Sequence, residues 1–91
     1  MSKKKAIDLI VFGKVQGVFF RAWTKEQAIR LGLSGWAKNL DDGSVLIHLE
    51  GKEEDLEAFK SLKPFGPPAS KVTKIITQDA NLFGLKGFEI F

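Results

Sequence analysis

Residues 13–21, with the sequence GKVQGVFFR, combine a flexible glycine with a nearby cation. Gly17 can adopt a positive φ and let the backbone approach a ligand closely. If a helix begins just after this loop, its first N–H groups lack intrahelical partners and favour an anion. Arg21 then adds a planar guanidinium that matches two phosphate oxygens at once. The pattern is compatible with a phosphate-type anion site, although an ordinary strand-to-helix turn with an exposed arginine is the simpler interpretation of this loop taken alone.

A second stretch, residues 35–45, reads GWAKNLDDGSV and contains a polar side chain suited to handling water. The Asp42-Gly43 pair is a hairpin turn signal, so Asn39 is expected to end a strand just before that turn. A carboxamide donates and accepts hydrogen bonds without becoming charged, so Asn39 could orient a water nucleophile. An asparagine that only terminates a strand is the simpler interpretation of Asn39 taken alone.

Composition narrows the chemistry further. The chain has 91 residues, no cysteine and one histidine, which excludes disulfides, thiolate nucleophiles and Cys-ligated zinc. We therefore expect neither a metal nor a cofactor. The net charge of +3 comes from Lys3, Lys4 and Lys5, because the remaining basic and acidic residues balance. No apolar run approaches the roughly 20 residues needed to span a bilayer, and the start is a poor signal peptide, so we expect a cytoplasmic protein.

Hydrophobic periodicity predicts the elements that must position these residues. In chain order they are a strand at 6–13, a helix at 20–31, strands at 33–39 and 45–50, a helix with the apolar stripe Leu56, Phe59 and Leu62, and strands at 71–78 and 86–91. This βαββαβ order, with a short final strand, is typical of an α+β, ferredoxin-like split βαβ sandwich: an antiparallel sheet with two helices on one face. We expect residues 1–5 to form a flexible basic tail and residues 6–91 a single domain.

Together the two stretches resemble the acylphosphatase family. The first is similar to its phosphate-loop motif G-x-V-x-G-V-x-F-R, and the second to its G-aromatic-x-x-N-x-x-D-G-x-V segment. Residues 66–72 and 88–90 also look like later landmarks of that family. The resemblance implies hydrolysis of the carboxyl–phosphate anhydride of acyl phosphates, with Arg21 binding the phosphate and Asn39 orienting the water. It also implies a phosphate cradle made by the backbone of Val15, Gln16, Gly17, Val18, Phe19 and Phe20.

That chemistry agrees with the composition. A carboxylate leaving group, with a pKa of about 4, departs without a general acid, and phosphoryl transfer relies mainly on positioning and charge stabilisation. No catalytic base is evident, and the resemblance suggests a phosphate oxygen of the substrate for that role. We expect a monomer that takes a small-molecule acyl phosphate, releases inorganic phosphate and is inhibited by it, and binds neither nucleic acid nor membrane.

Two positions depart from the family's pattern. Phe19 stands where many members have glycine, and Leu46 stands where an acidic residue often follows the valine. Neither change touches the arginine or the asparagine, so both bear on substrate preference more than on activity.

Other residues and readings carry less weight. His48 is interpreted as a sheet residue, Asp41 and Asp42 as turn formers, and Trp23 and Trp36 as packing residues. A non-catalytic anion-binding module remains an alternative, as does an acylphosphatase-like unit of a larger machine, although the length favours the free enzyme. An RNA-binding module of the same fold is a further alternative, but the predicted third strand carries no aromatic residue for base stacking.

Overall fold

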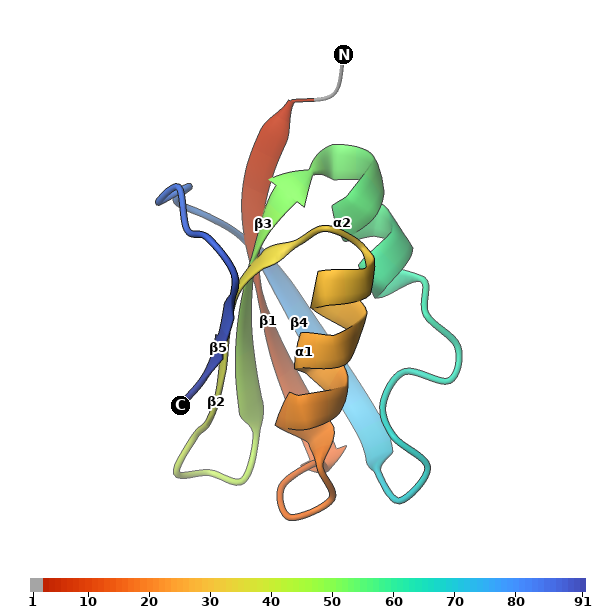
Figure 1. Ribbon diagram of the computed structural model, residues 1–91. Coiled ribbons are helices and arrows are strands. Elements are labelled where there is room, and N and C mark those ends of the chain that lie inside the picture. Colours follow the sequence, from red (N-terminus) through yellow and green to blue (C-terminus); the bar gives the residue numbers. More distant parts are fainter. Residues whose placement is uncertain (1–2) are drawn as a thin grey trace.

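The computed structural model describes residues 3–91 and places the elements in the predicted order (Figure 1). The elements are β1 (Lys4–Lys14), α1 (Phe20–Arg30), β2 (Ser34–Asn39), β3 (Val45–Lys52), α2 (Glu53–Lys60), β4 (Lys71–Ala80) and β5 (Phe88–Ile90). The predicted α+β class and βαββαβ order, followed by a short terminal strand, are confirmed. No helix within residues 3–91 is long and apolar enough to cross a membrane.

The strands form one sheet in the order β4-β1-β3-β2-β5. The predicted antiparallel pairing holds for β4, β1, β3 and β2, whereas β5 pairs with β2 in parallel and makes the sheet mixed at that edge. The chain path explains this difference. After β4, residues 81–87 cross to the opposite edge at the end of the sheet where β4 finishes. The chain then turns back along the sheet, so β5 runs opposite to β4 and in the same direction as β2. Because β1 and β2 are both antiparallel to β3, they finish at the same end of the sheet.

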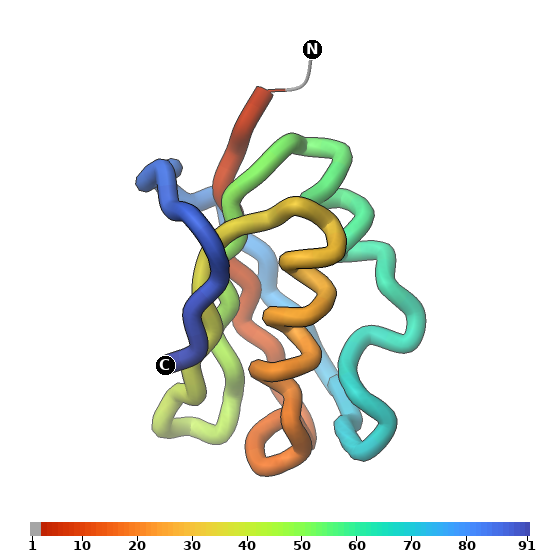
Figure 2. The backbone as a smooth tube through the Cα atoms, in the orientation of Figure 1, coloured from red at the N-terminus to blue at the C-terminus, as the bar shows by residue number. Residues whose placement is uncertain are grey.

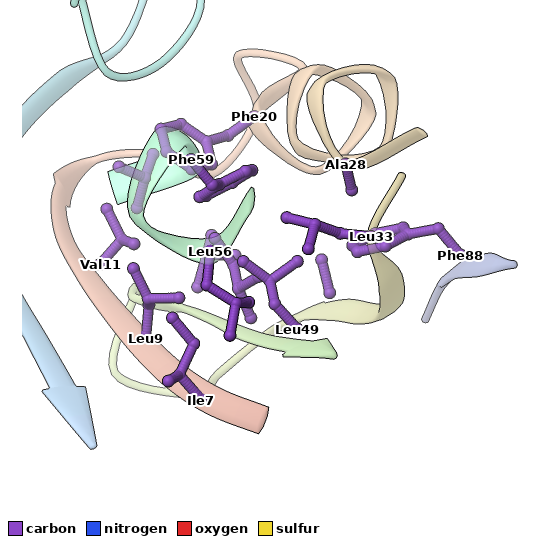
Figure 3. Close-up of a cluster of buried hydrophobic side chains, with 14 of the residues drawn as sticks. Ile7, Leu9, Val11, Phe20, Ala28, Leu33, Leu49, Leu56, Phe59 and Phe88 are labelled. Atoms are coloured by element: carbon purple, nitrogen blue, oxygen red, sulfur yellow. The ribbon is translucent and has the colours of Figure 1, made fainter. Parts of the chain in front are cut away.

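Both helices cover one face of the sheet, as Figure 1 shows. On β1 the alternating residues Ile7, Leu9 and Val11 are buried beneath them. Figure 3 shows these side chains meeting buried residues of α1, α2, β3 and β5 in one cluster, which includes Phe20, Ala28, Leu49, Leu56, Phe59 and Phe88. Burying one such Leu or Phe side chain contributes roughly 1.5–3 kcal/mol, so this cluster is the main force that holds the helices on the sheet.

A group of aromatic rings fixes the first half of α1. The Phe20 and Trp23 ring centroids lie 5.4 Å apart, and Phe65, in the connection after α2, lies 5.2 Å from Trp23. The buried Thr24 hydroxyl donates a 2.9 Å hydrogen bond to the main-chain oxygen of Phe20. Arg21 lies inside this anchored segment, so the position of its backbone is set by the core.

The first strand begins at Lys4, earlier than the predicted start at residue 6. The reason is that β3 continues to Lys52 and offers ladder partners to Lys4 and Lys5. Lys5 also forms a 2.6 Å ion pair with Glu53, although both side chains are more than half exposed and such pairs contribute little. Residues 1 and 2 of the predicted tail lie outside the described residues.

Candidate active site

Three connections meet at the end of the sheet where β1 and β2 finish. They are the loop between β1 and α1, the turn between β2 and β3, and the connection that leads into β4 (Figures 1 and 2). The end of β5 approaches the same region beside β2. The fold therefore brings both sequence stretches that carry the predicted chemistry to one end of the molecule.

A cavity of about 300 Å³ lies at this end. The predicted site residues that line it are Val15, Gly17, Phe19, Phe20, Arg21 and Asn39. Ala22 and Ile90 complete the lining and were not predicted. The side chains of two other predicted residues lie elsewhere: Val18 is buried, and Gln16 turns toward the hairpin.

The loop between β1 and α1 has the backbone shape of an anion cradle. Gly17 (φ 74°) and Phe19 (φ 64°) both adopt left-handed conformations on either side of Val18. Alternation of right- and left-handed residues is the arrangement that turns successive N–H groups into a concave anion-binding array. Within residues 3–91, no loop or cap hydrogen bond uses the amide of any residue from 16 to 20 as its donor. These amides, at the N-terminus of α1, are therefore available to a ligand.

Arg21 extends from the first turn of α1 and is held by the far end of the chain. Its Nη1 donates a hydrogen bond to the main-chain oxygen of Phe91, just beyond β5. A guanidinium has five N–H donors, so most of its donors stay open. Arg21 forms no ion pair with an Asp or Glu among the described residues. The cavity thus contains a positive charge whose position is fixed and which no carboxylate side chain neutralises.

Asn39 is the last residue of β2 and lies two positions after Ala37, which faces the helices and is fully buried. Residues two apart on a strand share a face, so the Asn39 side chain projects on the helix side, into the cavity. Its carboxamide has no hydrogen-bond partner within residues 3–91. Asn39 therefore lies beside the loop between β1 and α1, as the sequence predicted.

The turn that follows Asn39 is closed by its own polar groups. Leu40 N–H donates to Ser44 O at 2.9 Å, and Ser44 N–H donates to the Asp42 carboxylate at 2.9 Å. Hydrogen bonds from the Ser44 hydroxyl and amide lower the pKa of Asp42. Asp42 acts as a turn former, in agreement with its interpretation from the sequence.

Gln16 joins the loop to this turn, a role that sequence reasoning missed. Its Nε2 donates to Leu40 O at 2.8 Å and to Ser44 O at 2.9 Å. One side chain therefore ties the segment that carries Arg21 to the segment that carries Asn39. The sequence predicted only a backbone contribution from Gln16, because nothing in it indicates which carbonyl oxygens a loop carboxamide will meet.

The single histidine lies away from the cavity, on the sheet face opposite the helices. His48 is 1% exposed, and its two ring nitrogens lie 2.7 Å from carboxylate oxygens of Asp8 and Glu50. Trp36 stacks on the imidazole with ring centroids 5.5 Å apart. Within residues 3–91 no group of His, Asp or Glu side chains has an arrangement that could hold a metal ion.

Comparison with known proteins adds the family. Residues 7–90 match the family model named Acylphosphatase. The chain belongs to the acylphosphatase family. A curated acylphosphatase from Thermotoga maritima is 43% identical over 86 residues, which are 94% of this chain and 96% of that protein. The acylphosphatase family predicted from the two motifs is confirmed. The enzymes of this family are hydrolases.

Solved acylphosphatase structures share the whole fold. The crystal structure of acylphosphatase from Bacillus subtilis aligns with a TM-score of 0.91 at 40% identity, covering 98% of this chain and 99% of that chain. A structure of full-length HypF in a phosphate- and nucleotide-bound form aligns with a TM-score of 0.87 at 28% identity. That alignment covers 100% of this chain but 12% of the HypF chain, so the acylphosphatase fold also occurs inside a much longer protein.

Proposed function

We propose that the cavity is the site at which this acylphosphatase cleaves the carboxyl–phosphate anhydride of acyl phosphates. Arg21 and the backbone of residues 15–20 bind the phosphoryl group, and Asn39 orients the attacking water. The observation that carries the proposal is the cavity of about 300 Å³ that Arg21, Asn39 and the loop line together, where the loop amides from 16 to 20 have no acceptor within residues 3–91.

Phosphate binding follows from the donors that remain open. The loop amides and the positive end of α1 favour an anion, and the guanidinium fork fits two phosphate oxygens. The bond from Arg21 to the Phe91 main-chain oxygen holds the guanidinium in place before substrate arrives. Donors fixed in advance need no reorganisation when charge builds up on the equatorial oxygens, which is the condition for stabilising a phosphoryl-transfer transition state.

Asn39 supplies the second function, the orientation of water. Its carboxamide oxygen accepts a hydrogen bond from the water and directs the water oxygen at phosphorus. The Gln16 side chain sets the separation between the turn that carries Asn39 and the phosphate loop. Holding the reactants in a fixed geometry removes part of the entropic barrier to the reaction.

The bond changes balance without a protein acid or base. The water oxygen forms a bond to phosphorus, and the bond between phosphorus and the carboxyl oxygen breaks. The electron pair leaves with the carboxylate, which is stable as an anion because its conjugate acid has a pKa of about 4. The proton lost by water passes to a phosphate oxygen of the substrate. The products are a carboxylate and inorganic phosphate, and the phosphate then occupies the same cradle as an inhibitor.

This chemistry needs neither a metal ion nor a cofactor, because the leaving group is already weakly basic and the protein supplies the charge stabilisation. We further propose that the protein works as a cytoplasmic monomer on a small-molecule acyl phosphate, without nucleic acid or membrane. Residues 6–91 serve as one domain in this proposal, and the basic residues at the start of the chain take no part in catalysis.

An assay of phosphate release from benzoyl phosphate in the presence of EDTA tests the proposal. We expect hydrolysis at the same rate with and without the chelator, and competitive inhibition by inorganic phosphate. Loss of activity in EDTA, restored by a divalent ion, would contradict the metal-free mechanism. Phosphate binding without any hydrolysis would instead indicate the non-catalytic anion-binding alternative.

A further inference from the structure

Phe19 combines two costly features at the mouth of the cavity. Its side chain is 83% exposed, and it is the only described residue other than glycine with a positive φ. A left-handed conformation is unfavourable for a bulky side chain, and an exposed ring gives up the benefit of burial. Glycine would avoid both costs at this position.

The Phe19 ring has no aromatic partner among the described residues. The other strongly exposed phenylalanines do have partners: Phe83 lies 5.5 Å from the His48 ring, and Phe91 lies 6.2 Å from the Trp36 ring. Phe19 lines the cavity instead, next to the first turn of α1. An unpaired ring beside an anion site has contact area to offer to the rest of a bound ligand.

Ile90 provides a second apolar wall. It lies two residues after the buried Phe88 on β5, on the same face of the strand, and its side chain is 40% exposed. It lines the same cavity as Phe19, and the neighbouring Phe91 oxygen is bound by Arg21. The cavity therefore has a polar part, formed by the loop amides, Arg21 and Asn39, and an apolar part, formed by Phe19, Ala22 and Ile90.

We propose that Phe19 and Ile90 bind the acyl group and make the protein selective for acyl phosphates with aromatic or bulky apolar acyl groups. This inference rests on the proposed function, because it assumes that the phosphoryl group occupies the polar part. An acyl phosphate held in that way must direct its acyl carbon out of the cradle, where the large apolar side chains that the lining exposes are Phe19 and Ile90. An acetyl group is too small to cover both walls, whereas a benzoyl ring offers a face to each.

The test compares kcat/KM for benzoyl phosphate and acetyl phosphate in the parent, Phe19→Ala, Phe19→Gly and Ile90→Ala. Both substrates use the same cradle, so damage to the cradle lowers both values together and leaves their ratio unchanged. We expect the parent to prefer benzoyl phosphate, and the ratio to fall about tenfold in either Phe19 variant and by less in Ile90→Ala. Phe19→Gly separates the ring from the backbone, because glycine accepts the left-handed conformation without strain.

Ile29→Ala is the matched control, since Ile29 is an exposed apolar residue of α1 that does not line the cavity. Its ratio should equal that of the parent. An active Phe19→Gly variant with the parent's ratio would overturn this inference and leave the proposed function intact. A parent that hydrolyses neither substrate would overturn the proposed function itself, and this inference with it.

Discussion

The cavity and the opposite face of the sheet use polar side chains in contrasting ways. At the cavity, the Asn39 carboxamide has no hydrogen-bond partner within residues 3–91, Arg21 uses one donor, and the loop amides from 16 to 20 have no acceptor. The opposite face carries what we term the open-face cluster: Asp8, His48, Glu50 and the amides of residues 83–85. There the Glu50 carboxylate accepts hydrogen bonds from those three amides at 2.8–3.0 Å, and it also contacts His48.

This difference separates a binding site from a structural network. Buried polar groups must be hydrogen-bonded, and in the open-face cluster the bonds close within the protein and fasten the connection between β4 and β5. At the cavity, polar groups are also fixed in position, but they keep hydrogen-bond donors and acceptors that the protein does not use. A ligand can bind to these open groups. A histidine flanked by two carboxylates resembles a catalytic group, but both ring nitrogens of His48 are already hydrogen-bonded within the protein and are not open to a substrate.

The largest effect is expected from Arg21→Ala, which removes the one cation that residues 3–91 contribute to the cavity lining. Removing one preorganised donor from a transition-state site costs roughly 10²–10³ in kcat, and a charged group that also binds the ground state raises KM as well. We therefore expect kcat/KM for benzoyl phosphate to fall by at least that factor, with weaker inhibition by phosphate. Arg21→Lys should restore little, because an ammonium cannot reproduce the guanidinium fork.

Circular dichroism spectra and denaturation curves provide the control for folding in both variants. If a folded Arg21→Ala protein is inhibited by phosphate as strongly as the parent, the assignment of the cavity as the phosphate-binding site is wrong.

Asn39→Ala should have the next largest effect, and of a different kind. Its carboxamide is assigned to the water and not to the phosphate, so we expect kcat to fall roughly 10²-fold while the inhibition constant for inorganic phosphate stays near the parent value. Steady-state kinetics with phosphate as inhibitor measure both quantities. A large rise in that inhibition constant would mean that Asn39 binds phosphate, and an unchanged kcat in a folded variant would contradict its role.

Gln16 tests whether the loop and the turn must be held together. Gln16→Ala loses two hydrogen bonds, each contributing about 1 kcal/mol to stability, and frees Asn39 to move relative to the loop. We expect a loss of about tenfold in kcat, consistent with a small misplacement of a reacting group. Gln16→Glu should be worse, because a carboxylate would face the oxygens of Leu40 and Ser44. Equal kcat in the parent and in both variants would show that this tie is not needed for turnover.

The open-face cluster should affect stability and leave turnover near pH 7 almost unchanged. Burial raises the pKa of Glu50, but hydrogen bonds from His48 and from the amides of Phe83 and Leu85 outweigh burial and lower the pKa below its ordinary value of 4.5. The folded state therefore favours the ionised carboxylate. Its contribution to stability is complete above about pH 4.5 and is lost as the pH falls through the lowered pKa.

Urea denaturation of the parent and of Glu50→Gln at several pH values between 3 and 7 measures this contribution. We expect Glu50→Gln to be less stable at pH 7 by about 1–3 kcal/mol, and the difference to shrink toward pH 3. Glu57→Gln is the control, because Glu57 is exposed on α2, where it forms an ion pair with Lys60. A difference that does not change with pH would contradict the role given to the Glu50 charge.

Much of the fold followed from local pattern. The alternation on β1 and β3, the Asp42-Gly43 turn and the stripe on α2 each depend on residues close in sequence, so the order of elements was predictable. The parallel pairing of β5 was not, because it depends on the path of residues 81–87 across the sheet. The start of β1 at Lys4 likewise depends on how far β3 continues.

The candidate site divides in the same way. That Arg21 and Asn39 lie near each other could be predicted, because two spaced motifs carry them and because β1 and β2 finish at the same end of the sheet. The Gln16 bridge, the apolar wall at Ile90 and the bond from Arg21 to Phe91 join residues far apart in the chain, and single-sequence patterns contain no signal for such contacts. The left-handed Phe19 was also unpredictable, because residue type alone argues against that conformation.

The most direct test of the contrast between the two regions is a ¹H–¹⁵N NMR titration of the parent protein with inorganic phosphate. The account predicts saturable shifts of the amide signals of residues 16–20, which lack acceptors in the protein, together with the guanidinium signal of Arg21. The amide signals of residues 83–85, already bound to Glu50, should not move. Shifts confined to residues 83–85, or saturable binding that leaves the signals of residues 16–20 unchanged, would contradict it.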